Sequence, residues 1–590
     1  MKTYQFLWQM IRYRPLLYTT NAILWALIHL SPLIPGLILQ QFFNTLPAST
    51  HLNPVVWLLV TLLVATALAR CVLFLGGALA DIPHRFIMSA LLRRNLLERI
   101  LERPGARAVP DSPGEAISRF RDDARQAENA VSWTLDQIGL GLFAIVAVII
   151  LLTVNVMITL FVFIPLVCVI VTARIMNAQL EKYRIASRKA TGRVTSAIGE
   201  ICGTVQAIQV AGAETHVVEH MRTLNDARRV ATLKDSVLTQ TLNSTYENTV
   251  GLGTGVILIL AAQALHSTQL GVGDLALFIY YLAFITDFTQ EFGFFLAYYT
   301  QTKVSFQRMV KLLQGAAPAT LAAHKPLYLS GPEAAIPAVL PGTIHEGERL
   351  ETLEATGLTY HYPDTGRGIE DISLRIQKGT VTVITGRIAS GKTTLVQVLL
   401  GLLPGDAGEI CWNGERVSNP ASFFVPPHSA YTAQVPQLFS ASLRENILLG
   451  LPEETVDLHA AIHTAVMERD LEELEDGLHT LIGARGVKLS GGQAQRTAAA
   501  RMFVRPAELL VFDDLSSALD VETEHTLWER LFDRGKRTCL IVSHRRTVLQ
   551  RADHILVLKE GRLEAEGTLE YLLENCEEMR RLWSGNDEGP

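Results

Sequence analysis

Cysteine is scarce in this chain, and the few cysteines are scattered. Six occur among 590 residues, and no two of them have the spacing of a metal site or a redox pair. We therefore interpret them as buried or idle thiols. The six positions are Cys71, Cys168, Cys202, Cys411, Cys539 and Cys576.

An excess of positive charge is also missing. The net charge at pH 7 is −6, so the charge balance gives no indication of a nucleic-acid partner. A cleavable signal peptide is not expected, because the first apolar run is too long and no small-residue cleavage site follows it. Hydrophobic residues, in contrast, make up 49% of the chain and form long runs in its first half. The length of the chain predicts several domains.

The long apolar runs indicate membrane-spanning helices. A bilayer core of about 30 Å is crossed by roughly 20 apolar residues. The run 138–173 would be about 54 Å long as one helix, so we predict two helices with a tight turn at Asn155. Four other runs bring the predicted total to six spans. These runs are Leu16–Leu39, Val55–Leu79, Val250–Leu265 and Leu275–Phe295.

The distribution of lysine and arginine predicts the orientation of these spans. The segments 81–137 and 174–248 are rich in basic residues, whereas the short connections 40–54 and 266–274 contain none. The basic segments are therefore expected in the cytoplasm, together with both chain ends. Their apolar pattern is helical, which predicts that spans two to five continue as long cytoplasmic helices. Residues Tyr4–Tyr13 are expected to form an amphipathic helix on the inner membrane surface.

A segment rich in alanine, proline and glycine divides the chain. We interpret residues 315–350 as a linker between a membrane domain, residues 1–314, and a second domain, residues 351–590. The linker prolines are Pro318, Pro326, Pro332, Pro337 and Pro341.

The second domain contains a phosphate-binding loop in the expected context. A predicted strand, 381–385, leads into the loop, and a predicted helix, 394–400, follows it. Backbone N–H groups of such a loop cradle phosphates at a helix N-terminus, the lysine neutralises phosphate charge, and the next hydroxyl holds Mg²⁺. The predicted nucleotide-binding residues are Gly386, Arg387, Ile388, Ala389, Ser390, Gly391, Lys392, Thr393 and Thr394.

Two further elements complete this pattern. An apolar strand, 509–514, ends in Asp513 and Asp514, which are placed to organise Mg²⁺ and water beside the loop. The segment Leu489–Gln493 carries two glycines before a helix expected to start near Gln493, and so exposes N–H groups to an anion. The chain already has a phosphate loop for its own nucleotide. The simplest explanation is therefore that this second anion site binds the nucleotide of a second copy or partner. Its anion-binding residues are Ser490, Gly491, Gly492 and Gln493.

With these motifs, residues 351–580 resemble the nucleotide-binding domain of ATP-binding cassette (ABC) proteins. The whole chain resembles the exporter-type half-transporters of that family. The resemblance implies an all-α six-span membrane domain with long cytoplasmic helical extensions, followed by an α/β nucleotide-binding domain that is called the cassette. It also implies ATP and Mg²⁺ as cofactors, a second half-transporter as partner, and a place in the cell membrane with a cytoplasmic cassette.

The resemblance further implies roles for single residues. Tyr362 would stack on adenine, and Asp513, Thr393 and Gln434 would hold or sense Mg²⁺. Asp514 would be the catalytic carboxylate and His544 the switch histidine near the γ-phosphate, with Gln434 also part of the catalytic set.

Three positions depart from the family pattern. Asp514 stands where the family usually has a glutamate, Ala389 replaces a loop glycine, and Ala484 replaces a common glutamate. The first departure favours a heterodimer in which Lys392 and Asp514 belong to a weakened site. The intact segment Leu489–Gln493 would then complete the efficient site of the partner. A homodimer stays the alternative.

ATP-driven export is the function that we predict, with two alternatives. The chain could be a mainly ATP-binding regulatory subunit, or an importer with an exporter-like fold. Asp287 and Glu291 lie one turn apart in the last span and predict either a cavity for an amphipathic substrate or an internal salt bridge. The similar depth of Arg70 and Asp287 predicts an ion pair between them. Small molecule, lipid and peptide all stay open as substrates.

Overall fold

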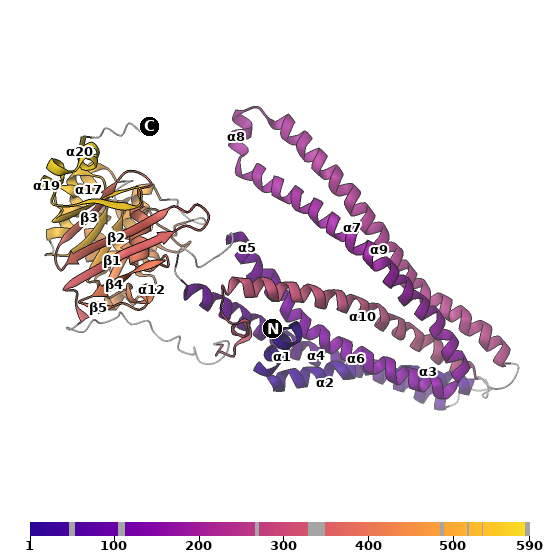
Figure 1. The fold of residues 1–590 in the computed structure, drawn as a ribbon. Helices are drawn as coiled ribbons and strands as arrows, with labels where there is room; N and C mark the ends of the chain where they lie inside the picture. Colours follow the sequence, from indigo (N-terminus) through magenta and orange to yellow (C-terminus); the bar gives the residue numbers. More distant parts are fainter. Residues whose placement is uncertain are drawn as a thin grey trace. The chain divides into compact units, whose positions relative to one another are not determined.

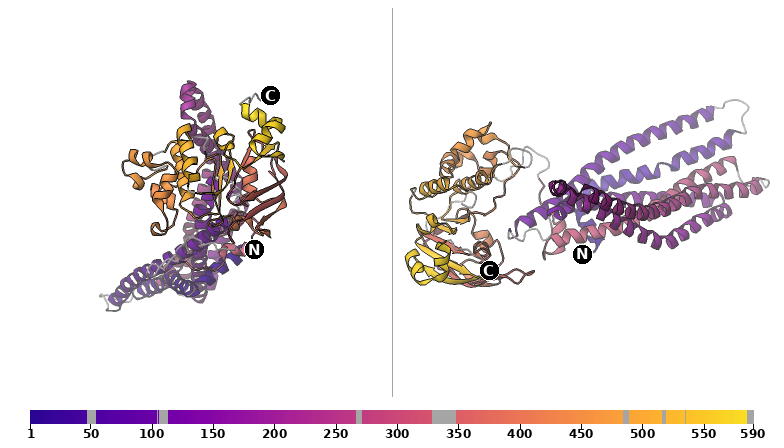
Figure 2. Two further views of the ribbon diagram at one scale, coloured as in Figure 1. Left: turned by 90° about the vertical axis from the view of Figure 1, so that its left-hand side faces the viewer. Right: turned by 90° about the horizontal axis from the view of Figure 1, so that it is seen from above.

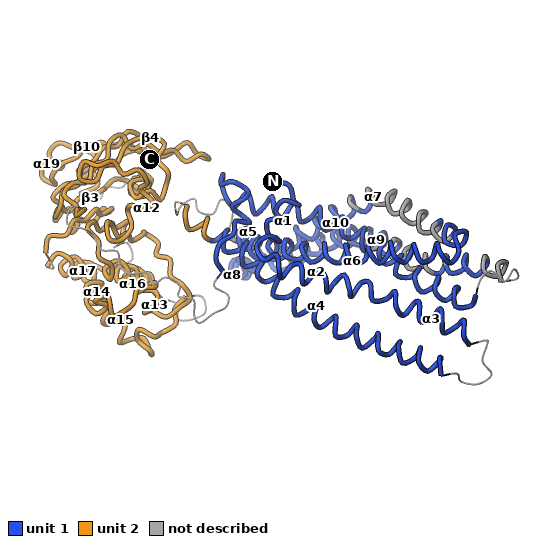
Figure 3. The backbone as a smooth tube through the Cα atoms, turned by 90° about the horizontal axis from the view of Figure 1, so that it is seen from below, with its two compact units in different colours: residues 1–97, 111–327 blue, residues 98–110, 328–590 orange. Residues whose placement is uncertain are grey.

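The chain forms two compact units (Figure 3). Residues 1–97 and 111–327 make up the first unit, and residues 98–110 and 328–590 make up the second. In the ribbon of Figure 1 the first unit is drawn with helices, and the second with strands and helices. The computed structural model describes residues 1–46, 54–103, 105, 113–265, 271–327, 348–483, 489–515, 519–533 and 535–584.

Long helices dominate the first unit. α4 has 48 residues, α7 has 48 and α9 has 52. At 1.5 Å per residue each is more than about 70 Å long, over twice the thickness of a bilayer core. The helices are α1 (Thr3–Tyr13), α2 (Pro15–Leu30), α3 (Leu33–Thr45), α4 (Pro54–Leu101), α5 (Pro113–Ser118), the π-helix η3 (Arg119–Asp123), α6 (Ala124–Val154), α7 (Val156–Gly203), α8 (Val205–Val210), α9 (Glu214–Leu265), α10 (Val272–Leu312) and the 3₁₀ helix η4 (Pro318–Ala322).

Four helical stretches of the described chain are long and apolar enough to cross a membrane. They are Pro15–Thr45, Pro54–Leu101, Gly114–Val154 and Val272–Leu312. The other two predicted spans fall at the start of α7 and the end of α9, mostly on residues whose side chains lie outside the described part. The count of six spans therefore stays a prediction.

The turn predicted at Asn155 is confirmed. α6 ends at Val154, and α7 begins at Val156. Asn155 between them has extended backbone angles, φ −158° and ψ 112°, and its side-chain oxygen accepts a hydrogen bond from the Ile158 N–H. Asparagine is favoured in this capping position because its oxygen satisfies an N–H group that has no partner within the helix. One residue therefore ends α6 and starts α7.

The first predicted span is not one continuous helix. α2 ends at Leu30 and α3 begins at Leu33, with Ser31 and Pro32 between them. Proline has no backbone N–H to continue the ladder, and its ring clashes with the preceding turn. The predicted span over 16–39 therefore contains a break, and the whole stretch Pro15–Thr45 is still long and apolar enough to cross a membrane.

The N-terminal helix α1 is held by other parts of its own unit. The ring of Phe6 stacks on Phe306 of α10 at 4.6 Å, and Met10 is fully buried. The Tyr13 hydroxyl donates a hydrogen bond to the carbonyl of Lys325. The predicted helix is confirmed, but one apolar face of it packs on protein. Tyr4 and Trp8 stay exposed on α1.

The first part of the predicted linker packs on the same unit. The Asn95 amide donates to the carbonyls of Leu321 (3.0 Å) and Ala323 (2.9 Å). The Leu321 side chain is fully buried. Residues up to 327 belong to the first unit, and most of the remaining predicted linker lies outside the described residues.

The predicted ion pair between Arg70 and Asp287 is not formed. The Arg70 guanidinium lies over the ring of Phe74, 5.5 Å from its centroid. Among the described residues no ion pair involves Asp287. Equal depth along two helices does not determine which way each side chain points around its helix axis, and this is why the prediction failed.

The second unit combines two sheets. The four-stranded antiparallel sheet has the order β2-β1-β4-β5, and the six-stranded sheet has the order β10-β9-β3-β8-β7-β6. β6, β7, β8, β3 and β9 run parallel, so their carboxyl ends meet at one edge. The strands are β1 (Thr352–His361), β2 (Gly368–Gln377), β3 (Val381–Gly386), β4 (Ala407–Trp412), β5 (Glu415–Arg416), β6 (Ser429–Thr432), β7 (Leu509–Asp513), β8 (Thr538–Val542), β9 (His554–Lys559) and β10 (Arg562–Gly567).

Helices cover both faces of the six-stranded sheet. α11 packs between the two sheets through Leu395 and Leu399, whereas α16 and α17 pack on the opposite face through Ala499 and Trp528. Figure 2 shows these layers from two further sides. Every residue of β3, β7 and β8 is buried, as expected for parallel strands covered on both faces.

The helices of the second unit are short. They are α11 (Lys392–Leu399), α12 (Pro420–Phe423), α13 (Leu443–Leu448), η6 (Glu453–Thr455), α14 (Leu458–Thr464), α15 (Glu468–Glu473), η7 (Gly477–His479), α16 (Gly491–Phe503), α17 (Val521–Asp533), α18 (Arg546–Leu549), α19 (Leu569–Asn575) and α20 (Glu577–Ser584).

A polar network joins three helices of the first unit. Asp81 of α4 accepts hydrogen bonds from the Asn21 amide of α2 (2.9 Å) and the Ser132 hydroxyl of α6 (2.6 Å). Arg85 lies 3.9 Å from the same carboxylate. Asn21 is fully buried and Asp81 nearly so. Because buried polar groups are costly when they lose a partner, this carboxylate stabilises the packing of the three helices.

Removal of Asp81 should therefore destabilise the first unit. We expect Asp81→Ala to lower the free energy of unfolding by about 2–4 kcal/mol and to lower the Tm of the chain in detergent. Asp81→Asn should lose less stability, because the asparagine side chain keeps one acceptor oxygen. The control is Asp226→Ala, which removes an exposed carboxylate paired with Arg229. An Asp81→Ala protein as stable as this control would contradict the role of the network.

Candidate nucleotide-binding site

The phosphate loop lies at the carboxyl end of β3. β3 ends at Gly386, and α11 begins at Lys392. Gly391, the N-cap of α11, has φ +100°, and a side chain there would approach Ile369 to 2.9 Å. Ala389 also has a left-handed backbone, with φ +65°. The loop therefore curls tightly over the helix N-terminus, where backbone N–H groups attract anions.

Two cations of the loop point in different directions. The Lys392 ammonium donates to the carbonyls of Gly386 and Arg387, both at 2.7 Å. The Arg387 guanidinium turns away and donates to the buried carboxylate of Glu578 on α20, at 2.6 Å. Lys392 lines the cavity described below, as predicted. Arg387 instead anchors the loop to the C-terminal helix, and only its backbone is left for a nucleotide.

The predicted Mg²⁺ ligands lie together. The Thr393 hydroxyl donates to Asp513 Oδ1 at 3.0 Å, and the Tyr431 hydroxyl donates to Asp513 Oδ2 at 3.3 Å. Burial raises the pKa of the Asp513 carboxyl, and the two hydroxyls oppose this rise. One carboxylate and one hydroxyl beside a phosphate loop fit Mg²⁺, which usually binds few protein oxygens together with phosphates and water. The sequence did not indicate Tyr431, a residue of β6 that comes beside Asp513 because β6 pairs with β7.

The predicted catalytic residues surround the same point. Asp514 has φ +50°, and its N–H donates to the carbonyl of Val542 at the end of β8. The Gln434 amide donates to Asp514 Oδ2 at 3.2 Å. Asp514 Oδ1 is buried and has no hydrogen-bond partner within the described residues. His544 follows β8 and lines the same cavity.

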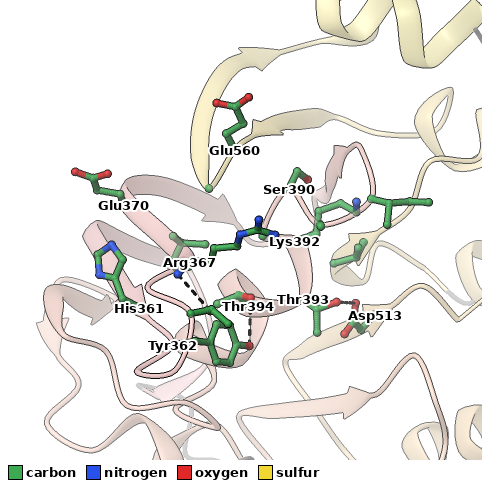
Figure 4. A pocket seen from close by; sticks show the side chains of 18 of the residues that line it. His361, Tyr362, Arg367, Glu370, Ser390, Lys392, Thr393, Thr394, Asp513 and Glu560 are labelled. Atoms are coloured by element: carbon green, nitrogen blue, oxygen red, sulfur yellow. Dashed lines mark hydrogen bonds between the residues drawn. The ribbon is translucent and has the colours of Figure 1, made fainter. Parts of the chain in front are cut away.

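A cavity of about 970 Å³ brings these groups together (Figure 4). Tyr362 forms one end, where its hydroxyl lies 3.4 Å from Thr394 Oγ1. Its ring and that of Tyr360 are nearly perpendicular, and the residue is 37% exposed, so part of its surface is open to a planar base. The predicted residues that line the cavity are Tyr362, Ile388, Ala389, Ser390, Gly391, Lys392, Thr393, Thr394, Gln434, Asp513, Asp514 and His544.

Two turns that the sequence did not indicate complete the wall. Arg367 comes from the β1–β2 connection and Glu370 from the start of β2, and Glu560 and Gly561 come from the β9–β10 turn. The Gly561 N–H donates to the carbonyl of Ser390 at 3.1 Å, so the second turn supports the phosphate loop. In the sequence, the glycines of these two turns were the only signal that could have indicated them.

The second predicted anion site falls on the capped N-terminus of α16, outside the cavity. Ser490 caps α16: its hydroxyl accepts from the Gln493 N–H at 3.2 Å, and the Gln493 side chain accepts from the Ser490 N–H at 2.9 Å. The helix begins at Gly491, two residues earlier than expected. None of Ser490, Gly491, Gly492 and Gln493 lines the cavity. Ala484 and residues 516–518 lie outside the described residues.

Known protein families match both halves of the chain. The ABC transporter transmembrane region matches residues 19–287, and the model described as ABC transporter matches residues 369–517. A solved structure of a bacterial Atm1-family ABC exporter with ATP bound is similar at a TM-score of 0.75 and 20% identity, and the match covers 97% of this chain and 98% of that chain. This likeness shows that the chain has the fold of that exporter, a helical membrane domain followed by an α/β nucleotide-binding domain.

Curated relatives match at lower coverage. An ATP-dependent lipid A-core flippase of Pseudomonas fluorescens is 36% identical over 243 residues, 40% of this chain and 40% of the flippase. The Mesentericin-Y105 transport/processing ATP-binding protein MesD of Leuconostoc mesenteroides is 26% identical over 483 residues, 81% of this chain and 64% of that protein. The chain spans between 21% and 41% of the length of the first curated relatives that it matches.

Replacement of Lys392 tests the phosphate loop. Lys392→Ala should weaken ATP binding roughly tenfold or more, because a charge-assisted interaction with the phosphates is lost. Lys378→Ala is the control, since this lysine is exposed and pairs with Glu351 outside the cavity. Equilibrium titration of the full chain with ATP gives both affinities, and an unchanged Kd in Lys392→Ala would rule out the assignment.

The left-handed backbone at residue 389 predicts a substitution that stabilises the protein. Alanine at φ +65° is strained by about 1 kcal/mol relative to glycine. Ala389→Gly should therefore raise the Tm of the nucleotide-free protein without loss of ATP affinity. Ala460→Gly in α14 should lower it by a similar free energy, because glycine weakens a helix. A lower Tm for Ala389→Gly would show that the strain is absent.

Proposed function

The chain belongs to the ABC transporter family, and we propose that it is one half of an ATP-driven exporter that works as a dimer. The observation that carries this proposal is the presence of two anion sites that do not meet within one chain. The phosphate loop lines the cavity, whereas the capped N-terminus of α16 lies outside it. Each nucleotide would be held by the loop of one subunit and by Ser490 and Gly491 of the other.

ATP and Mg²⁺ have defined places in this proposal. Adenine stacks on Tyr362, and the phosphates lie on the loop near Lys392. Thr393 and Asp513 hold Mg²⁺, which neutralises charge on the outer phosphates when it is bound. Gln434 connects this region to Asp514, and His544 lies near the terminal phosphate.

The membrane half has six spans in this proposal, with both chain ends and the cassette in the cytoplasm and the protein in the cell membrane. The basic segments 81–137 and 174–248 support this orientation by the positive-inside rule. The length of α4, α7 and α9 supports it as well, because each helix is long enough to cross the bilayer and continue into the cytoplasm.

The substrate class is proposed from α10. Successive rings of Phe288, Phe292, Phe295 and Tyr299 lie 5.9–6.4 Å apart along this helix. The carboxylates of Asp287 and Glu291 are on the same stretch and are exposed in the single chain. Aromatic rings beside acidic groups suit an amphipathic small molecule, lipid or peptide. The named relatives include a lipid A-core flippase and a mesentericin-Y105 transport/processing protein, and the flippase supports a lipid as one member of this range.

The transport proposal is tested with purified complexes in lipid vesicles. The chain and its partner subunit are reconstituted, and ATP-dependent movement of amphipathic cations, lipids and peptides is measured with substrate presented on the cassette side. Movement away from the cassette side supports export. Movement toward it would instead support an importer with an exporter-like fold.

We further propose that the native complex is a heterodimer with unequal ATP sites. A general base must lie within about 2.6–3.2 Å of its water. Asp514 is one methylene shorter than the glutamate usual in the family, and one of its oxygens is bonded to Gln434. A site with this carboxylate would hold ATP and turn over slowly, while the partner's site hydrolyses. In the alternative, the chain is a mainly ATP-binding regulatory subunit.

Two substitutions separate these possibilities. In the native complex Asp514→Asn should leave most ATPase activity, because most turnover takes place at the partner's site, which does not use Asp514. Ser490→Asp should nearly abolish it. Aspartate still caps α16, but its charge repels the phosphates of the partner's nucleotide.

The control for folding is the Tm of both variants without nucleotide. If Asp514→Asn stops turnover as completely as Ser490→Asp, Asp514 is a working catalytic base. A homodimer of this chain is then the better model.

A further inference from the structure

The β1–β2 connection delivers an arginine to the cavity. The Tyr362 N–H donates to the carbonyl of Arg367 at 2.8 Å, and the Gly366 N–H donates back to Tyr362 at 2.8 Å. Gly366 has φ +66°, which closes this tight turn without strain. Tyr362 and Arg367 are therefore fixed as neighbours across the turn. Figure 4 shows the Arg367 side chain pointing from the turn toward the phosphate loop.

The charge of Arg367 is not neutralised by the protein. Within the described residues no ion pair involves Arg367. Two carboxylates lie three residues away in the sequence: Glu370 is paired with Arg562 at 2.6 Å, and Asp364 forms no ion pair within the described residues. Arg375, further along the same strand, is paired with Glu354 at 3.2 Å. Arg375 and Arg562 therefore have acidic partners, whereas Arg367, which lines the cavity, has none within the part of the chain that the structure describes.

The other cations near the loop are engaged differently. Arg387 is paired with Glu578 and faces away from the cavity. Lys392 donates to two loop carbonyls. A nucleoside triphosphate carries several negative charges, and a guanidinium can bind two phosphate oxygens at once. Arg367 is thus a cation with uncommitted donors at the position where the phosphates and the base would meet.

We infer that Arg367 is a further nucleotide-binding residue that contacts the phosphate groups nearest to the base. The inference rests on the proposed ATP site and adds to it a cation that the phosphate loop does not supply. Because Arg367 follows Tyr362 in one closed turn, the same element would hold the base and its first phosphates. The ligand class is a nucleoside di- or triphosphate, and a nucleoside alone would gain nothing from this residue.

The test compares ligands that differ only in phosphate. ATP, ADP and adenosine compete with a fluorescent ATP analogue for the full chain in detergent. Arg367→Gln should weaken the binding of ATP and ADP roughly tenfold and leave the affinity for adenosine unchanged. The ATP affinity of Arg367→Lys should lie between those of Arg367→Gln and the native protein, because lysine keeps the charge but lacks the planar guanidinium. Arg375→Gln, which removes the same charge from the adjoining strand β2, should change the affinity for none of the three ligands.

Each outcome decides the inference. Equal losses for ATP and adenosine would mean that Arg367 acts through the base or Tyr362, and would overturn it. Unchanged ATP affinity in Arg367→Gln would also overturn it, while a loss in Lys392→Ala in the same assay would leave the proposed function intact. If the native chain fails to bind ATP, the proposed function itself fails. Equal Tm values of the Arg367 and Arg375 variants show that folding is not the cause.

Discussion

The buried carboxylate of Asp513 is the group on which the rest of the site depends. It ends a strand in which every residue is buried, where a charge is costly unless hydroxyls or a cation compensate. Thr393 and Tyr431 supply the hydroxyls, so the phosphate loop and β6 are both tied to β7. Burial still keeps the pKa of Asp513 raised. The arrangement is therefore prepared for a divalent cation, which would compensate the charge that the protein leaves partly unsatisfied.

The site has a second consequence, which concerns assembly. Parallel strands place the phosphate loop, Asp513 and His544 at one edge of the sheet, and these groups meet in one cavity. At the N-terminus of α16, Ser490 and Gln493 cap each other, and a helix N-terminus attracts anions in general. In the dimer that we propose, a second cassette supplies the half of the site that one chain lacks, and nucleotide binding is then coupled to dimerisation.

The helical unit follows a different constraint. Its helices are too long to be stabilised by the bilayer alone, and polar contacts join them along their length. Asp81 connects α2, α4 and α6, and Asn95 fastens the chain after α10 to α4. The N-terminal helix is held to the same segment through Tyr13. These contacts belong to one unit, and they tie the start of the chain to the residues that lead toward the cassette.

The sequence by itself determined the features that are local. The loop 386–394, the strand ending in Asp513 and the turn at Asn155 are all encoded by neighbouring residues whose backbone preferences agree, so they could be predicted. Tertiary structure alone decided which way single side chains point. Arg387 turns toward a helix nearly two hundred residues later, and Arg367 reaches the cavity only because the β1–β2 turn lies beside the loop. Such choices depend on partners distant in the sequence, and no local pattern records them.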